Sequence, residues 1–174
     1  MTAASASRLA RRARSVGAGP PDRVLLLEHL RHALLEAKSD PSLCVAFLLL
    51  RVKAGVSEAE RPGAMARLQE QLRAAVRSRP WRGRRDLVAW LGGGEFAILT
   101  APLNEVRDAE RIAQRLLELA ARSLQEEGEA LVPRLAIGIA AVHGRYRRPE
   151  ELLAAARRAL EEAEQAFAGW RVKT

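Results

Sequence analysis

The chain has 174 residues, of which 48% are hydrophobic, a length and composition that suit one soluble domain with a hydrophobic core. Its apolar run from Val45 to Leu50 is far shorter than the ~20 residues that a membrane-spanning helix needs, which argues against membrane insertion. The single cysteine, Cys44, excludes a disulfide framework and a cysteine metal site. We therefore expect a cytoplasmic protein in which Cys44 only fills the core.

The first 20 residues differ in composition from the rest of the chain. They contain four arginines among Ala, Ser and Gly, they lack acidic residues, and a Gly-Pro-Pro sequence follows at 19–21. This composition predicts a disordered basic tail over 1–20 and one domain over 21–174, with a mitochondrial transit peptide as the alternative reading of the tail. The net charge of +8 also raises nucleic acid as a partner, but with 4% aromatic residues no stacking platform for single strands is evident.

Hydrophobic periodicity divides the domain into alternating helices and strands. The predicted elements are, in chain order, a helix over 24–37, a strand over 43–52, a helix over 65–76, a β-hairpin over 86–100, a helix over 109–124, a strand over 131–142, a helix over 149–167 and an edge strand over 170–173. The predicted buried face of the first helix consists of Val24, Leu27, Leu30, Leu34 and Ala37. Asn104 is the predicted N-cap of the long third helix, which stops near Gly128. This order predicts an α/β sandwich in which helices flank a central mixed sheet.

The hairpin is the most informative segment. Gly92, Gly93 and Gly94 lie between two apolar runs, and glycine accepts the positive φ that tight two-residue turns need. With Glu95 and Phe96, these glycines resemble the signature hairpin of the GGDEF family, in which an acid stands where this chain has Gly94.

Further segments resemble the same family over about residues 22–174. The sequence Ile-Gly-Ile-Ala at 137–140 is similar to the family's SIGIA strand, 150–164 is similar to its EELL..AD.AL..AK helix, and 169–172 lies where GRNRV is expected. The resemblance implies a GGDEF-like fold, of the type shared with nucleotidyl cyclases and polymerase palms.

Active members of the family are diguanylate cyclases, in which two divalent metals align the phosphates of GTP. Metals of this kind need carboxylate ligands, yet the resemblance places Arg51, Lys53 and Gly94 at the metal-binding positions. It places Glu164 at the phosphate-binding lysine, and it places Ala59 and Leu68, or Glu60 and Gln69 after a slip of one residue, at the guanine-reading positions. The resemblance therefore implies a degenerate domain, a pseudoenzyme that holds no metal and no cofactor.

Many family members also bind their product through an RxxD motif before the hairpin. Asp86 matches its aspartate, but Gly83 replaces the arginine. Because arginine suits phosphate contact and guanine stacking, a shifted site for cyclic di-GMP formed by Arg82, Arg84, Arg85 and Asp86 is one interpretation. A solvated basic loop is the other, with Trp81 as an anchor for an acidic protein partner or as a lid on the core.

A second candidate partner surface precedes the last helix and consists of Arg145, Tyr146, Arg147 and Arg148. Three hypotheses about function stay open: a protein-binding scaffold or regulator in bacterial cyclic di-GMP-related signalling, a receptor for cyclic di-GMP or another nucleotide, and nucleic-acid binding through the tail. The first is favoured and nucleic acid is disfavoured. The sequence leaves a homodimer open.

Overall fold

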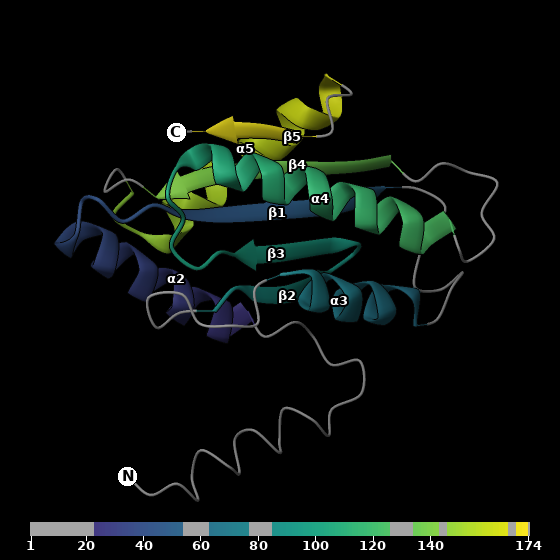
Figure 1. The fold of residues 1–174 in the computed structure, drawn as a ribbon, viewed down its shortest axis with the longest axis horizontal. Helices are drawn as coiled ribbons and strands as arrows, with labels where there is room; N and C mark the ends of the chain where they lie inside the picture. Colours follow the sequence, from purple (N-terminus) through teal and green to yellow (C-terminus); the bar gives the residue numbers. More distant parts are fainter. Residues whose placement is uncertain are drawn as a thin grey trace, which may run out of the picture.

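The computed structural model describes residues 23–53, 63–76, 85–125, 134–142, 146–166 and 170–173 (Figure 1). The elements are α2 (Arg23–Ser39), β1 (Val45–Lys53), α3 (Ala64–Ala75), β2 (Leu87–Gly92), β3 (Glu95–Leu99), α4 (Val106–Gln125), β4 (Arg134–Val142), α5 (Pro149–Gln165) and β5 (Trp170–Lys173). The predicted order of helices and strands is confirmed. The predicted tail lies outside the described residues and stays a prediction.

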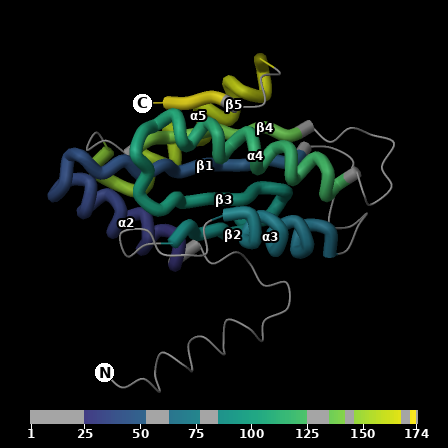
Figure 2. Tube along the Cα trace, in the orientation of Figure 1, coloured from purple at the N-terminus to yellow at the C-terminus, as the bar shows by residue number. Residues whose placement is uncertain are grey.

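The five strands form one sheet in the order β2-β3-β1-β4-β5. β1 is central and pairs antiparallel with β3 and β4, β2 pairs antiparallel with β3, and β5 runs parallel to β4. Figure 2 shows this arrangement as the blue trace of β1 between β3 and β4. The mixed sheet of the predicted α/β sandwich is thus confirmed.

Alternation along β1 builds two cores, one on each face of the sheet. Leu48 and Leu50 point to the face that α3 and α4 cover, whereas Phe47 and Leu49 point to the face that α2 and α5 cover. All four are fully buried. Such a run, apolar on both faces, is what a central strand between two helical layers requires. Cys44 is also buried, and burial raises the pKa of its thiol.

The predicted buried face of α2 is confirmed for Leu30, Leu34 and Ala37, and Leu27 is partly buried against the same core. Leu26 and Ala33 also belong to this core but were not predicted. Four apolar residues in a row, 24–27, fit more than one helix face, so periodicity alone does not select Leu26. The prediction of Asn104 as the N-cap is wrong: α4 begins at Val106, and the carboxylate of Asp108 accepts the backbone N–H groups of Asn104 and Glu105.

The helix α5 lies directly on the backbone of β4 at Gly138. A Cβ at this position would be 2.1 Å from the carbonyl oxygen of Ala156 and 2.3 Å from the nitrogen of Leu160. Only glycine allows so close an approach. This contact fixes α5, and with it Glu164 near the end of the helix, against the α2 and α5 face of the sheet.

None of the described helices combines the length and the apolar character that crossing a bilayer requires.

Candidate functional site at the end of the central strand

The turn of the β2–β3 hairpin is formed by Gly93 and Gly94, with φ of 57° and 79°. Two successive positive φ values characterise the type I′ turn, which fits the twist of a two-residue hairpin. The pairing slips by one residue between Trp90 and Gly92, which also has a positive φ. The tight hairpin predicted from the glycines is confirmed.

This turn rests on the end of β1. The N–H of Val52 donates to the carbonyl oxygen of Gly94 at 2.9 Å. A Cβ on Gly94 would lie 2.7 Å from the carbonyl oxygen of Val52, closer than real Cβ contacts allow. The position of the family's hairpin acid therefore has no room for a side chain in this conformation.

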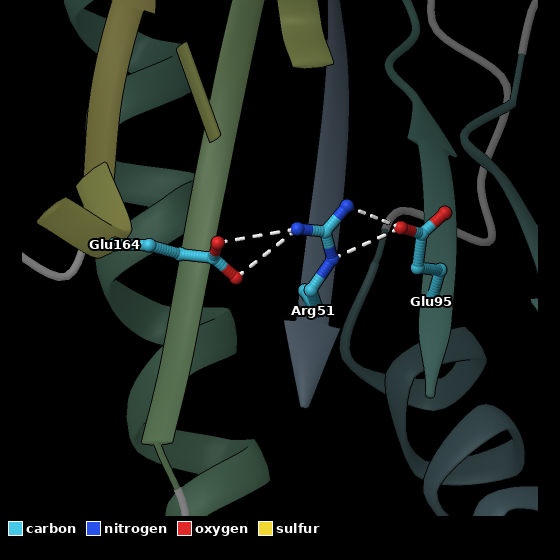
Figure 3. Close-up of polar contacts among 3 residues, drawn as sticks. All are labelled: Arg51, Glu95 and Glu164. Carbon is cyan, nitrogen blue, oxygen red and sulfur yellow. Dashed lines mark hydrogen bonds and ion pairs between the residues drawn. The ribbon is translucent and has the colours of Figure 1, made fainter. Parts of the chain in front are cut away.

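Beside the turn, three charged side chains from three elements meet in what we call the Arg51 cluster: Arg51 of β1, Glu95 of β3 and Glu164 of α5 (Figure 3). Register places Arg51 opposite Glu95 in the antiparallel pair of β1 and β3. The packing of α5 on β4 supplies Glu164 from the other side. Figure 3 shows the guanidinium lying between the two carboxylates.

The guanidinium of Arg51 bonds to both acids. Its Nε and Nη2 donate to Oε1 of Glu95 at 2.9 Å and 2.5 Å, and its Nη1 donates to Oε1 and Oε2 of Glu164 at 3.3 Å and 3.2 Å. Arginine suits such multiple contacts because its donors form a rigid planar fork. One cation thus joins two strands and a helix.

The cluster is largely shielded from solvent. The side chains of Arg51, Glu95 and Glu164 are 23%, 20% and 13% exposed. Burial by itself lowers the pKa of Arg51, but the hydrogen bonds and negative charges of Glu95 and Glu164 outweigh it and raise that pKa above its ordinary value. The guanidinium is therefore charged at every working pH, and the cluster carries one positive and two negative charges.

The remaining signature residues have mixed roles. Phe96 is fully buried and stacks on Trp90, with ring centroids 6.4 Å apart. Lys53 ends β1, but its side chain lies outside the described part of the structure. Of the two candidates for the second guanine-reading position, Leu68 is buried in the core. The amide oxygen of Gln69, in the orientation that satisfies both of its groups, accepts the backbone N–H of Trp90 at 3.2 Å.

The basic loop is only partly described. Trp81, Arg82 and Arg84 lie outside the described residues, so their predicted roles stay predictions. Arg85 is exposed. The carboxylate of Asp86 accepts the backbone N–H of Ala101 at 2.6 Å, which joins the start of β2 to the end of β3.

The second candidate surface is also divided. Arg145 lies outside the described residues, and Tyr146 packs against the core between the sheet and α5. Arg147 and Arg148 are exposed, and Glu151 in the first turn of α5 accepts the backbone N–H of Arg147 at 2.9 Å and Nε of Arg148 at 3.1 Å. These bonds lower the pKa of Glu151, that from Arg147 contributing most. Part of this surface thus caps a helix.

Sequence reasoning missed two features of the site. It identified Arg51 and Glu164 as separate departures from the family but did not pair them, although two opposite charge reversals in one site are a signal of compensation. It also missed that α3 covers the edge strand β2, where Arg73 donates to the carbonyl of Val88 at 3.4 Å. Within the described ranges, no group of three or more His, Cys, Asp or Glu could hold a metal ion.

Comparison with known proteins finds similar solved structures, among them the following three. The GGDEF domain of YfiN (TpbB) from Pseudomonas aeruginosa is 29% identical, with a TM-score of 0.66 and coverage of 87% of this chain and 95% of that chain. Two others share the fold at lower identity. The diguanylate cyclase SiaD of P. aeruginosa, in complex with its activator SiaC, is 21% identical, with a TM-score of 0.59 over 83% of this chain and 55% of that one. The GGDEF domain of DgcB from Caulobacter crescentus, in complex with c-di-GMP, is 16% identical, with a TM-score of 0.57 over 84% and 85%.

No curated protein is significantly similar to the chain. The family profile described as "Diguanylate cyclase, GGDEF domain" matches residues 63–168, more than half of the sequence. With the fold and the hairpin already described, this match identifies the protein: the chain belongs to the GGDEF family.

Proposed function

We propose that this GGDEF domain makes no cyclic di-GMP and acts as a protein-binding regulator or scaffold in cyclic di-GMP-related signalling. The observation that carries the proposal is the guanidinium of Arg51, which lies between Glu95 and Glu164 where the family holds metal ions. An internal cation that bonds to both carboxylates takes the place of the external ones.

The residues present do not fit a pair of divalent cations. Magnesium requires about six oxygen ligands in near-octahedral geometry. The position in β1 has a fixed positive charge, and the position in the hairpin has a glycine whose Cβ would meet the backbone of Val52. The hairpin keeps one carboxylate of the family signature, Glu95, but that carboxylate already accepts two hydrogen bonds from Arg51. We therefore derive no catalytic step through metals.

Electrostatics also disfavour the substrate. The charges of the Arg51 cluster sum to −1, and Glu164 stands where the resemblance expects a phosphate-binding lysine. A triphosphate would meet a net negative charge in a partly buried site, where repulsion is stronger than in water. GTP would have to break the existing ion pairs before it could contact Arg51.

A domain that keeps its fold, but in which an arginine occupies the metal-binding position, can still act through its surfaces. Within the family fold, SiaD is known in complex with a protein, its activator SiaC. The basic residues around 77–85 and the tail are the surfaces that we propose for contact with an acidic signalling or assembly protein. The exposed Arg85 is the described member of this surface.

Binding of cyclic di-GMP is the second candidate, since DgcB, which shares the fold, is known with c-di-GMP bound. The hydrogen bond from Ala101 to Asp86 would hold the end of this loop, just before β2, against the sheet. That bond also shows which variant to use as a test: replacing Asp86 would disturb the fold, whereas the exposed Arg85 and its neighbour Arg84 can be replaced instead.

The decisive test of inactivity is incubation of the purified protein with GTP and Mg²⁺ or Mn²⁺, followed by chromatography of the nucleotides, with an active diguanylate cyclase as positive control. We expect no cyclic di-GMP. Product above background, lost on heat denaturation of the protein, would overturn the proposal.

Calorimetric titration with cyclic di-GMP separates the two remaining functions. The matched variants are Arg84→Ala/Arg85→Ala and, on the exposed side of α5, Arg157→Ala/Arg158→Ala. Absence of heat up to about 100 µM ligand would mean an affinity far weaker than that of a second-messenger receptor. This outcome supports the protein-binding function. Tight binding that only the first variant loses would assign the receptor function to the basic loop.

A further inference from the structure

The outer surface of α2 carries hydrophobic side chains that no described element covers. Leu25 and Leu35 are 41% and 62% exposed and are the exposed large hydrophobic side chains of the described residues. The buried side of the same helix, with Leu26, Leu30 and Leu34, faces the sheet. Among the described residues, the exposed large hydrophobic side chains therefore both belong to one helix.

The exposed side chains follow a helical seam. Leu25, Glu28, His32 and Leu35 are spaced by three, four and three residues, and Glu28 and His32 are also exposed. Such spacing places side chains along one stripe, as in the a and d positions of a coiled coil. The stripe lies on the side of α2 opposite the core.

The spacing of the four residues is the same in both directions along the helix. Its midpoint is residue 30, so a second, antiparallel copy of α2 places Leu25 of one copy against Leu35 of the other. The same symmetry places Glu28 against His32, an acid against a basic side chain. An isologous two-fold interface requires this kind of self-complementarity.

A parallel pair would match each residue with itself. Glu28 would then lie against Glu28 of the second copy, and like charges that face each other are destabilising. The repulsion between the two Glu28 side chains therefore favours the antiparallel arrangement over the parallel one.

A depression beside the stripe provides space for the contact. It is lined by His32, Leu35, Glu36, Ser39, Asp40 and Leu43, where α2 ends and the chain turns toward β1. In the antiparallel arrangement Leu25 of the second copy comes to Leu35 at the rim of this depression. The apolar sides of Leu35 and Leu43 would receive it.

We propose that the outer face of α2 is a homodimer interface, formed with an antiparallel α2 of a second copy through the stripe Leu25, Glu28, His32 and Leu35. The interface is small compared with the 1,200–2,000 Å² of total surface that stable complexes bury. Dimerisation is accordingly expected only at high protein concentration. The stripe shares no residue with the Arg51 cluster and does not depend on the function proposed for that site.

Cysteine cross-linking tests the orientation. Leu25→Cys and Leu35→Cys variants, one with a larger affinity tag, are oxidised separately and as a mixture, blocked with a thiol reagent and separated on a non-reducing gel. The parent protein controls for Cys44, which is 3% exposed. We expect a heterodimer band in the mixture and little dimer in either variant alone. Dimers in each single variant would show a parallel pair and overturn the proposal, as would the absence of any cross-link.

A charge swap tests the contact itself by sedimentation velocity over about 10 µM to 1 mM protein. Glu28→Arg should weaken dimerisation at least tenfold, and adding His32→Glu should restore it to within about threefold of the parent. Leu35→Asp should abolish it, and Lys38→Glu, elsewhere on the exposed surface of α2, serves as the control. A parent protein that is monomeric throughout, or a double variant no better than Glu28→Arg, would overturn the proposal.

Discussion

The packing contact of α5 on β4 and the Arg51 cluster lie on the same face of the sheet and involve the same helix, but they depend on different interactions. At Gly138 the contact is backbone against backbone, with no space for a methyl group. At the Arg51 cluster the contact is between charges, with a guanidinium between two carboxylates. The first contact retains the family's sequence and the second departs from it.

This difference shows which constraints a folded domain keeps when a ligand site changes. A packing contact cannot change at one position without disturbing the fold, because protein interiors are close-packed. A charged site can change if its charges are paired again, since an unpaired charge in a partly buried site is costly. Arg51 pairs with both Glu95 and Glu164, so each carboxylate of the site has a partner within the protein.

The largest effect is expected from breaking the packed contact. Gly138→Ala introduces a methyl group into the backbone of α5, which cannot relieve the overlap by rotating a side chain. We expect the free energy of unfolding, measured by urea denaturation, to fall by about 3 kcal/mol or more.

Gly92→Ala is the control for that variant, because a Cβ there meets nothing within 4 Å and only the positive φ of 84° is unfavourable. It should cost about 1–2 kcal/mol. Equal losses in the two variants would contradict the assignment of Gly138 to a packing role.

The next effect comes from breaking the charged contact. Arg51→Met removes the cation and leaves Glu95 and Glu164 facing each other, so we expect a loss of about 2 kcal/mol in the free energy of unfolding. Adding Glu95→Gln and Glu164→Gln removes the repulsion and should recover most of the loss. Arg158→Met, at an exposed position of α5, is the control. If the triple variant were less stable than Arg51→Met, the charges would not be what couples these residues.

The same contrast explains what the sequence could predict. Packing and turn chemistry leave local signals: the apolar run of β1, the glycines of the turn, and the Ile-Gly-Ile-Ala strand were enough to predict the sheet, the hairpin and the family. Most of the buried face of α2 was also predicted, but Leu26 was omitted because four consecutive apolar residues, 24–27, fit several faces.

The Arg51 cluster could not be predicted in the same way. Arg51, Glu95 and Glu164 are far apart in the sequence, and their contact depends on strand register and on the seating of α5. Each charge change was visible in the sequence, but which residue it pairs with depends on the tertiary structure. Similarly, the start of α4 was misplaced because Asp108, inside the first turn, reaches back to the backbone N–H groups of Asn104 and Glu105, a contact that the pattern of apolar residues does not reveal.

A smaller effect is expected where packing and charge meet, at the hairpin turn. Gly94→Asp restores the family's acid but places its Cβ against the carbonyl of Val52, so it should cost about 1–2 kcal/mol more than Gly93→Asp, whose Cβ meets nothing within 4 Å. Urea denaturation of the two variants gives the comparison. Equal stability would show that the turn adapts easily, and Gly94 would then be no barrier to an acid at this position.

The smallest effect is expected at a charged contact on the surface, which can be compared with the partly buried Arg51 cluster. Glu151 is exposed and accepts hydrogen bonds from the backbone of Arg147 and the side chain of Arg148, which lower its pKa. A carboxylate whose pKa is lower in the folded state stabilises the protein above its ordinary pKa of about 4.3 and loses that contribution as the pH falls through the folded value. Glu151→Gln should therefore lower the thermal midpoint slightly at pH 7, with no difference from the parent near pH 2–3, and the neighbouring exposed Glu150→Gln should change it less. A difference that persisted in acid would mean that the side chain acts through its shape. Its disappearance would show that the contribution comes from the charged carboxylate, and its small size beside the loss expected for Arg51→Met would then show how much burial adds to a charged contact.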